Sequence, residues 1–274
     1  MKKGTIVGKG REAEVIAWDD GYVLKLFYNI VSRQRIEYEF KVNILVQKVF
    51  DNCPKAFKII EENERIGILF EFIEGKNLGE VGGKNIFKLV KLVKLVAKLH
   101  AELHKHKINN LNLQKDVYTR SIQRTPLLNK LEKMKIIKYL ERISEGNTIC
   151  HSDFHPENII ISQSKLYIID WANTTLGNPN GDVARTYYLL KYGMGPDDVE
   201  LIEKSVFHKL IFRLFKKILS KVYLKQYIKL TSSSLENIKE WDIIIYAARL
   251  NEDIEEEQEI LLNLIHQRLK NLDF

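Results

Sequence analysis

The segment with the clearest potential for chemistry runs from Cys150 to Asp170 and reads CHSDFHPENIIISQSKLYIID. Two short apolar runs, at 159–161 and 166–169, are separated by a polar turn, a pattern that predicts two strands joined in a hairpin. The hairpin would place Asn158, at the start of one strand, next to Asp170, at the end of the other. A hard cation such as Mg²⁺ takes oxygen ligands, usually only one or two of them from protein. The sequence therefore predicts a magnesium site at the open end of this hairpin.

A third oxygen-bearing residue, Asp153, lies five positions before Asn158 on the same loop. Together they form the pattern His-x-Asp-x-x-x-x-Asn, which resembles the catalytic loop of the protein kinase-like superfamily. The resemblance implies phosphoryl transfer from a magnesium-bound nucleotide, in which Asp153 orients the attacking hydroxyl and accepts its proton, while Asn158 and Asp170 bind metal. An Asp and an Asn at this spacing also cap turns between buried strands. The agreement of the loop, the hairpin and Asp170 favours the catalytic interpretation.

Further motifs narrow the resemblance to the aminoglycoside phosphotransferase and choline kinase-type branch of small-molecule kinases. His155 stands where protein kinases usually have lysine, and Trp171 follows Asp170 where they have Phe-Gly. The other motifs of this branch are GNPNGDVAR at 177–185, LHAELH at 99–104 and AARLNE at 247–252. The resemblance covers nearly the whole chain and is strongest between residues 151 and 185. It implies that His155 lies near the γ-phosphate of the nucleotide.

Near the start of the chain, the segment from Gly8 to Val15 fits the glycine loop G-x-G-x-x-G-x-V of kinases, with Ala13 in the third glycine place. Glycines such as Gly8 and Gly10 let backbone amides approach a phosphate without an intervening side chain. A hairpin turn also requires glycine, so the loop alone does not identify a nucleotide site. Lys25, twelve residues beyond Ala13 on an apolar strand, supports that interpretation. It would pair with the α- and β-phosphates as a point charge.

An amphipathic helix is predicted over residues 32–50, where kinase-like folds need a glutamate to hold the strand lysine. Glu39 is the preferred residue, because it lies three positions from Ile36 and so nearer the inward face of the helix. Glu37 is the alternative. A solvated carboxylate that serves no site would explain either residue taken singly.

The segment from Glu71 to Gly75 is where the predicted strands give way to helices, and we interpret it as a hinge. Adenine would bind to backbone groups near Glu71 and Ile73, so the side chains do not distinguish ATP from GTP. The resemblance implies an α+β, protein kinase-like fold of two lobes. Residues 1–73 would form the nucleotide-binding lobe, a small antiparallel sheet with one helix. Residues 74–274 would form the larger, mostly helical lobe, which carries catalysis and substrate binding.

The segment after the hairpin bears on the acceptor. Only eleven residues separate Asp170 from Asp182, too few for the activation segment that holds the substrates of protein kinases, and no Ala-Pro-Glu motif is present. A small molecule with a hydroxyl group is therefore the favoured acceptor: an aminoglycoside, an amino alcohol such as choline, or a sugar. The family resemblance further implies that Asp182 braces the catalytic loop through hydrogen bonds to its backbone, and that Arg185 supports this contact.

The C-terminal part offers two features that would suit a cationic acceptor. The acidic stretch at 252–259 resembles the acidic residues with which aminoglycoside kinases meet their acceptor, although an exposed helix face explains it equally well. Trp241 and Tyr246 would suit a quaternary ammonium group, although burial against neighbouring helices is the simpler interpretation. A nucleotide-binding regulator without catalysis, or a protein kinase, are the alternative functions. The intact Asp153, Asn158 and Asp170 argue against the regulator.

A long helix is predicted over residues 85–106, with lysines on one face and apolar residues over the rest. His100 and His104 lie four positions apart within it, a spacing that suits two ligands of one metal ion. The sequence offers no third ligand and no His-Glu-x-x-His motif, so we expect both to be packed in the interior.

Composition is consistent with a soluble, cytoplasmic enzyme. A chain of 274 residues with 45% hydrophobic content can bury the core of one large domain or two lobes. The net charge of +7 comes from scattered lysines without the aromatic interleaving of nucleic-acid binders, so no nucleic-acid partner is expected. No apolar run suits a signal peptide or a membrane span, and no membrane partner is expected. Cys53 and Cys150 have no metal-type spacing and fit a reducing compartment.

Overall fold

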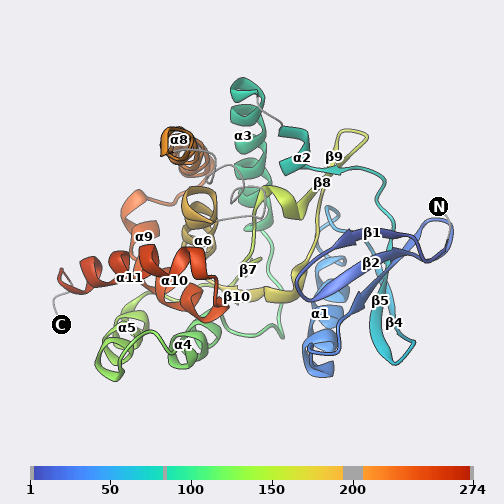
Figure 1. Ribbon diagram of the computed structural model, residues 1–274, viewed down its shortest axis with the longest axis horizontal. Coiled ribbons are helices and arrows are strands. Elements are labelled where there is room, and N and C mark those ends of the chain that lie inside the picture. The colour runs from blue at the N-terminus through green and yellow to red at the C-terminus, as the bar shows by residue number, and fades with distance from the viewer. Residues whose placement is uncertain (1–2, 83–84, 194–205, 272–274) are drawn as a thin grey trace. The chain divides into compact units, whose positions relative to one another are not determined.

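The computed structural model describes residues 3–82, 85–193 and 206–271 (Figure 1). The chain forms two compact units. The first consists of Met1–Gly83 and Pro156–Thr174, and the second of Lys84–His155 and Thr175–Phe274. The first unit therefore combines two stretches that are far apart in sequence, the later of which begins within the catalytic-loop motif. The predicted division near Ile73 into a nucleotide-binding and a catalytic lobe stays a prediction.

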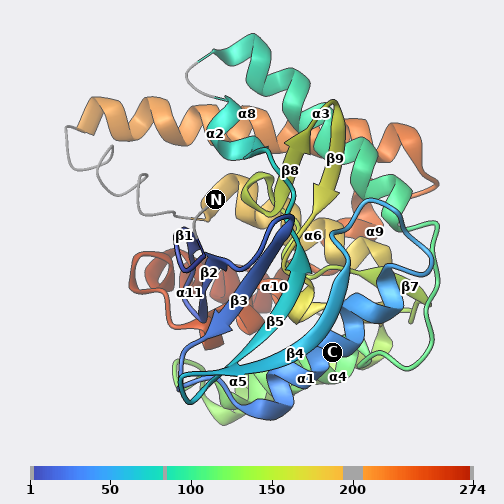
Figure 2. The ribbon, with the colours of Figure 1, turned by 90° about the vertical axis from the view of Figure 1, so that its right-hand side faces the viewer.

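The first unit contains an antiparallel sheet of five strands in the order β1-β2-β3-β5-β4 (Figure 2). The strands are β1 (Ile6–Lys9), β2 (Ala13–Ala17), β3 (Tyr22–Phe27), β4 (Ala56–Glu62) and β5 (Arg65–Glu71). The turn between β4 and β5 has left-handed backbone at Asn63 and Glu64, with φ of 50° and 62°. Two consecutive left-handed residues suit a hairpin because their twist matches that of the strands. The small antiparallel sheet predicted for this part of the chain is present.

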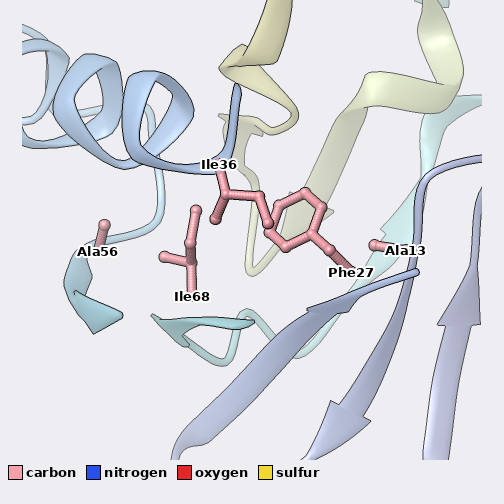
Figure 3. Packing of buried hydrophobic residues seen from close by; sticks show 5 residues of the cluster. All are labelled: Ala13, Phe27, Ile36, Ala56 and Ile68. Atoms are coloured by element: carbon pink, nitrogen blue, oxygen red, sulfur yellow. The ribbon is translucent and has the colours of Figure 1, made fainter. Parts of the chain in front are cut away.

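The core of the first unit is formed by side chains from this sheet and from helix α1 (Arg33–Val46). Its central residues are Ala13, Phe27, Ile36, Ala56 and Ile68 (Figure 3). The helix begins after Ser32, whose side chain accepts a hydrogen bond from the Arg35 N–H and so satisfies one of the free amides of the first turn. Ile36, one turn after this cap, packs with Ala13 and Phe27 of the sheet. This contact determines which face of the helix points inward.

The hairpin predicted after the catalytic-loop motif is also present. Strand β8 (Ile159–Ser162) pairs antiparallel with β9 (Lys165–Ile168), and β6 (Lys76–Asn77) adds to the other edge of β8. Gln163 and Ser164 form the turn with left-handed φ of 46° and 71°. Three short helical segments adjoin these strands: α2 (Leu78–Gly82), η1 (Pro156–Asn158) and η2 (Trp171–Asn173).

Trp171 fixes the end of the hairpin. Its side chain is fully buried, and its indole N–H donates a hydrogen bond of 3.0 Å to the Ile168 carbonyl. The ring also packs edge-on against Phe50, with 6.2 Å between the ring centroids. A large aromatic ring with its polar atom satisfied is a strong packing anchor. The backbone directly after Asp170 is therefore held in place.

The second unit is mostly helical. Its helices are α3 (Ile86–Leu103), α4 (Gln114–Arg124), α5 (Lys130–Arg142), α6 (Pro179–Tyr192), α8 (Val206–Leu230), α9 (Leu235–Lys239), α10 (Asp242–Arg249) and α11 (Glu255–Leu269), with η3 (Leu250–Glu252) between the last two. Strands β7 (Thr148–Cys150) and β10 (Thr175–Gly177) form a two-stranded antiparallel ladder. Helix α8 packs against α3 and α6, and α10 packs against α4, α5, α6 and α11. None of the helices in the described ranges has an apolar stretch able to cross a bilayer.

Side-chain caps set the starts of two helices of the second unit. Helix α5 begins at Lys130, where Asn129 and Glu132 form a capping box. Asn129 supplies the side-chain oxygen that the first amides of the helix need. Ser234 caps α9 and accepts a hydrogen bond from the N–H of Asn237.

Candidate active site

The first unit brings together Lys25, Glu39 and Asp170, three of the residues predicted from the sequence. Lys25 Nζ donates to Glu39 Oε1 at 2.7 Å and to Asp170 Oδ1 at 2.9 Å. Lys25 comes from β3, Glu39 from α1, and Asp170 directly follows β9 and precedes η2. The Glu39 side chain is 1% exposed and that of Asp170 is 43% exposed, so the lysine connects a buried carboxylate with an accessible one.

The periodicity of α1 explains why Glu39 is the partner of Lys25. Ile36, Glu39 and Asn43 are among the buried residues of the helix, at the spacing of one helical face. Glu37 points elsewhere and forms an ion pair of 3.5 Å with Arg33, and both of these side chains are about half exposed. The carboxylate that holds the strand lysine is therefore Glu39.

The two carboxylates keep Lys25 charged. Burial by itself would lower the pKa of Lys25, because it removes water from the ammonium group. The neighbouring charges of Glu39 and Asp170, together with their hydrogen bonds, outweigh this effect and raise the pKa above its usual value. Lys25 is thus a fixed positive charge at neutral pH, as a group that binds phosphate must be.

Asn158 and Asp170 approach one another at the open end of the hairpin. Ile159 pairs with Ile168, and the Ile169 N–H donates to the Asn158 carbonyl at 3.0 Å. Asp170 has left-handed backbone, with φ 63° and ψ 66°, a conformation that Asp adopts more readily than most residues. A carboxylate and an amide oxygen, from two residues whose backbones lie close together, are the kinds of donor that fit Mg²⁺. The role of both residues as metal ligands stays a prediction.

The glycine loop lies in the turn between β1 and β2, where Gly10 N–H donates to the Ala13 carbonyl at 2.8 Å. A Cβ on Gly8 would come no nearer than 3.8 Å to Val15, and a Cβ on Gly10 no nearer than 3.6 Å to the Ala13 carbonyl. These are ordinary contacts, so the chain itself does not require glycine at either position. This finding is consistent with the predicted role of both glycines, which is to let a phosphate come close to the backbone.

Glu71 and Ile73, the predicted adenine-binding residues, lie at the end of β5 and two residues beyond it. The Glu71 N–H donates to the Lys55 carbonyl at 2.8 Å, and the following N–H of Phe72 donates to the Gly21 carbonyl at 2.8 Å. The strand therefore stays tied to its neighbours up to the predicted hinge. The binding of adenine here stays a prediction.

The second unit places Asp153 between the side chains of Arg185 and His155. Arg185 Nη2 lies 3.5 Å from Asp153 Oδ1, and His155 Nε2 lies 3.6 Å from Asp153 Oδ2. Burial would raise the pKa of Asp153, but the hydrogen bond and charge of His155, followed by the charge of Arg185, lower it below its usual value. Asp153 is therefore ionised at neutral pH. Its side chain is 23% exposed, which leaves it accessible to a small molecule.

Asp182 holds the backbone of the catalytic loop. Its Oδ2 accepts the His151 N–H at 2.6 Å and its Oδ1 accepts the Ser152 N–H at 2.8 Å, and its side chain is fully buried. Ser152 has left-handed backbone with a φ of 64°, and its carbonyl accepts a 2.6 Å hydrogen bond from Arg185 Nε. Two residues of α6 therefore define the loop conformation on both sides of Ser152.

His100 and His104 are buried in the second unit and share Asp182. Their Nε2 atoms lie 3.1 Å and 3.3 Å from Asp182 Oδ2, while their Nδ1 atoms contact the hydroxyls of Tyr223 and Tyr227 at 2.6 Å and 2.7 Å. Asp182 is the third potential ligand that the sequence did not reveal, because it is 78 residues from His104. Both ring nitrogens of each histidine already have a hydrogen-bond partner. The arrangement fits a packed polar network, as the sequence predicts.

This network makes the stability of the protein depend on pH. Burial and the nearby His104 lower the pKa of His100 to about 3, from an ordinary value of 6.5. Between these two values the unfolded chain binds the proton and the folded chain does not, so stability falls as the pH falls from about 6.5 towards 3. One such group contributes a slope of up to about 1.4 kcal/mol per pH unit.

We expect the His100→Asn variant to have a flatter dependence of Tm on pH than the wild type between about pH 6.5 and pH 4. Thermal unfolding followed by circular dichroism at several pH values measures this. His266→Asn is the matched control, because His266 is exposed on α11 and is not part of the network. Equal slopes for the wild type and His100→Asn would contradict the assignment.

The acidic stretch contains two residues that the sequence did not identify as internal partners. Glu252 Oε1 lies 2.7 Å from Arg185 Nη1, and the fully buried Glu257 forms a two-point ion pair with Arg249. Arg249 also pairs with the other oxygen of Glu252, and their spacing of three on helical backbone would have signalled this pair. Trp241 and Tyr246, considered for a quaternary ammonium group, are both buried, in agreement with the simpler interpretation.

The chain was compared with known proteins. A sequence model of the phosphotransferase enzyme family, abbreviated APH, matches residues 3–206. The chain is 25% identical over 195 residues to a "Protein LicA homolog" of Mycoplasma capricolum subsp. capricolum, an alignment covering 68% of this chain and 74% of the relative. A second LicA homolog, from Metamycoplasma hominis, is 25% identical over 177 residues, covering 61% and 68% of the two chains.

Solved structures with the same fold include aminoglycoside phosphotransferases. A thermostable mutant of APH(4)-Ia in its apo form gives a TM-score of 0.63 at 12% identity, with 97% of this chain and 92% of that chain covered. Aminoglycoside-3'-phosphotransferase of type VIII gives a TM-score of 0.59 at 14% identity, with 89% and 92% covered. The predicted kinase-like α+β fold is confirmed. Since the family model spans well over half of its length, the chain belongs to the phosphotransferase enzyme family.

Proposed function

We propose that this protein transfers the γ-phosphoryl group of ATP or GTP to a hydroxyl group of a small molecule. The proposal rests on the contacts of Lys25, a buried cation. Its Nζ lies 2.7 Å from the Glu39 carboxylate and 2.9 Å from the accessible carboxylate of Asp170. A lysine fixed in this way, on a strand next to a glycine loop, serves to bind nucleotide phosphates. A regulator without catalysis would not need the ionised Asp153 in addition.

Each group in the first unit has a role in holding the nucleotide. Lys25 pairs with the α- and β-phosphates, and Glu39 keeps it in position. Gly8 and Gly10 let the backbone of the β1–β2 turn approach the phosphates. Asn158 and Asp170 would hold Mg²⁺, which when bound neutralises charge on the β- and γ-phosphates.

In the second unit, Asp153 acts on the acceptor. Its carboxylate accepts a hydrogen bond from the attacking hydroxyl and so orients the oxygen towards phosphorus. Because His155 and Arg185 lower the pKa of Asp153, the carboxylate stays ionised and takes the proton only as the new bond to phosphorus forms. The loose transition state of phosphoryl transfer suits such a weak base. His155 is proposed to lie near the transferred phosphoryl group.

The acceptor is a small molecule with a hydroxyl group. An aminoglycoside, an amino alcohol and a sugar are the candidate classes, since the structural neighbours are named as aminoglycoside phosphotransferases and two sequence relatives are named LicA homologs. The short connection between Asp170 and Asp182 favours these classes over a protein acceptor.

The test is a screen of hydroxyl-bearing metabolites and antibiotics for nucleotide consumption, with ATP and GTP assayed separately and Mg²⁺ present. We expect one small-molecule class to be phosphorylated, with the product identified by mass spectrometry. Phosphorylation of protein substrates alone would overturn the proposal in favour of a protein kinase. Tight nucleotide binding without transfer to any acceptor would favour the regulator.

Lys25→Met should raise the KM for nucleotide by about 10- to 100-fold, because it removes a charge-assisted contact to phosphate. The KM for the acceptor should stay close to that of the wild type. Steady-state kinetics with each substrate varied in turn measures both values. Lys58→Met, at an exposed position of β4, is the control for loss of a positive charge. An effect confined to the acceptor KM would remove Lys25 from the phosphate site.

A further inference from the structure

We propose that Glu252 is a positioning residue, which holds Arg185 against the catalytic-loop Asp153 and thereby sets the orientation of the reacting carboxylate. The acidic residues Glu252 and Glu257 then serve an internal chain of charges and do not bind a cationic acceptor. This inference rests on the proposed function, since it assigns a role to Glu252 in the same reaction.

Arg185 makes three contacts within the second unit, and its side chain is 5% exposed. Nε donates to the Ser152 carbonyl at 2.6 Å, Nη2 lies 3.5 Å from Asp153 Oδ1, and Nη1 lies 2.7 Å from Glu252 Oε1. The guanidinium group is planar and rigid, so a strong contact at one nitrogen fixes the direction of the others. Glu252 makes the shorter of the two contacts to a carboxylate and therefore sets where Nη2 meets Asp153.

Glu252 is itself held by a second arginine, Arg249. Arg249 donates to Glu252 Oε2 through Nη1, and to both oxygens of Glu257 through Nε at 2.8 Å and Nη2 at 2.9 Å. Glu257 is fully buried and accepts a further 2.8 Å hydrogen bond from the Tyr188 hydroxyl. Charges therefore alternate from Asp153 through Arg185, Glu252 and Arg249 to Glu257. Removing one partner of a buried ion pair strongly destabilises the folded protein, because the other charge is left unpaired. Each member of this series therefore keeps its neighbours in position.

Glu252 is the last residue of the short helical segment η3, and the next residue, Asp253, has left-handed backbone with φ 52° and ψ 50°. Both oxygens of Glu252 are used, Oε1 by Arg185 and Oε2 by Arg249. A cationic acceptor at Glu252 would have to share the carboxylate with these two arginines, whose positive charges would repel it. The contacts thus favour the internal role over acceptor binding.

The Glu252→Gln variant separates these roles through kcat and KM. We expect kcat to fall by about 10- to 100-fold, the loss that follows small misplacement of a reacting group, while KM for the acceptor and for nucleotide changes less than about twofold. A raised acceptor KM with unchanged kcat would overturn the proposal, because it marks a group that binds the acceptor. Glu255→Gln and Glu256→Gln, exposed carboxylates in the first turn of α11, are matched controls and should leave both constants unchanged.

The route through Arg185 is tested by a double-variant cycle. In an Arg185→Lys background, adding Glu252→Gln should change kcat by less than about twofold, because the rigid connection is already lost. Equal factors in the two backgrounds would show that Glu252 does not act through Arg185 and would overturn the proposal. Thermal unfolding and nucleotide affinity, measured on every variant, identify any loss of kcat that comes from unfolding.

A measurement that needs no turnover distinguishes a failure of this inference from a failure of the proposed function. The side-chain ¹⁵N resonances of the Arg185 guanidinium, assigned with Arg185→Lys, report how tightly the group is held. We expect slow rotation in the wild type and in Glu255→Gln, and faster rotation in Glu252→Gln. Unchanged rotation in Glu252→Gln would overturn the positioning role. If the wild type phosphorylates no acceptor, the proposed function fails and the ¹⁵N result alone decides the role of Glu252.

Discussion

Asp153→Asn is expected to lower kcat by about 10²- to 10⁴-fold, the range seen when a general base is removed. The variant keeps the size of the side chain but removes the negative charge that attracts the proton of the acceptor hydroxyl. Nucleotide affinity should hardly change, because the phosphate-binding residues proposed here are Lys25, Gly8 and Gly10. Turnover with the acceptor found by screening and calorimetry with nucleotide measure the two quantities.

The alternative role of Asp153, as a cap of a turn, predicts a different outcome. Asn caps turns as well as Asp does, so turnover would survive in Asp153→Asn and only stability would shift. Retained turnover would therefore falsify the role as base. Thermal unfolding of the same variant shows whether the protein is folded. Glu157→Gln, which removes an exposed negative charge from the neighbouring η1 turn, is the control.

Asp170→Ala should abolish magnesium-dependent nucleotide turnover, with a loss of at least about 10²-fold. The change removes a carboxylate that is 43% exposed and lies 2.9 Å from Lys25, so a metal ligand and a partner of the phosphate-binding lysine disappear together. Calorimetric titration of nucleotide with and without Mg²⁺ gives a second readout. The wild type should bind nucleotide more tightly with Mg²⁺, and the variant should show little difference.

Asp51→Ala is the control for Asp170→Ala, because it removes another exposed carboxylate from the same unit. It should leave both turnover and the magnesium dependence of binding intact. Wild-type turnover in Asp170→Ala, or a magnesium effect on binding equal to that of the wild type, would remove Asp170 from the metal site. Asn158→Ala should have a smaller effect than Asp170→Ala, because an amide oxygen carries no net charge.

The first unit could be read from the sequence to a large extent because its signals are local. The hairpin around Asn158 and Asp170 follows from two apolar runs and a polar turn, and both strands are present. Helical periodicity selected Glu39 over Glu37, and Lys25 Nζ lies 2.7 Å from Glu39. Helix starts leave a weaker signal, since a cap depends on which side-chain oxygen reaches the first amides, as Asn129 and Ser234 show.

The second unit was harder to predict because its contacts join residues far apart in the chain. The family resemblance implied the contact of Asp182 with the catalytic loop about 30 residues away, but the contact of Asp182 with His100, 82 residues away, leaves no periodic signal. The stretch at 252–259 was recognised as acidic, but its composition does not show that Glu252 and Glu257 meet arginines. Long-range charge pairing depends on how helices pack, which short-range pattern reasoning does not reach.

The burial of Trp171 has a consequence for how activity is controlled. In protein kinases the residue after the metal-binding Asp is part of a switch, since its packing distinguishes active from inactive states. Here that residue is fully buried, hydrogen-bonded to Ile168 and packed on Phe50. Moving a large apolar side chain from its buried site into water costs about 1.5–3 kcal/mol, so a state with Trp171 released would be a minor one. We infer that the segment after Asp170 keeps one conformation and does not act as the switch that it forms in protein kinases.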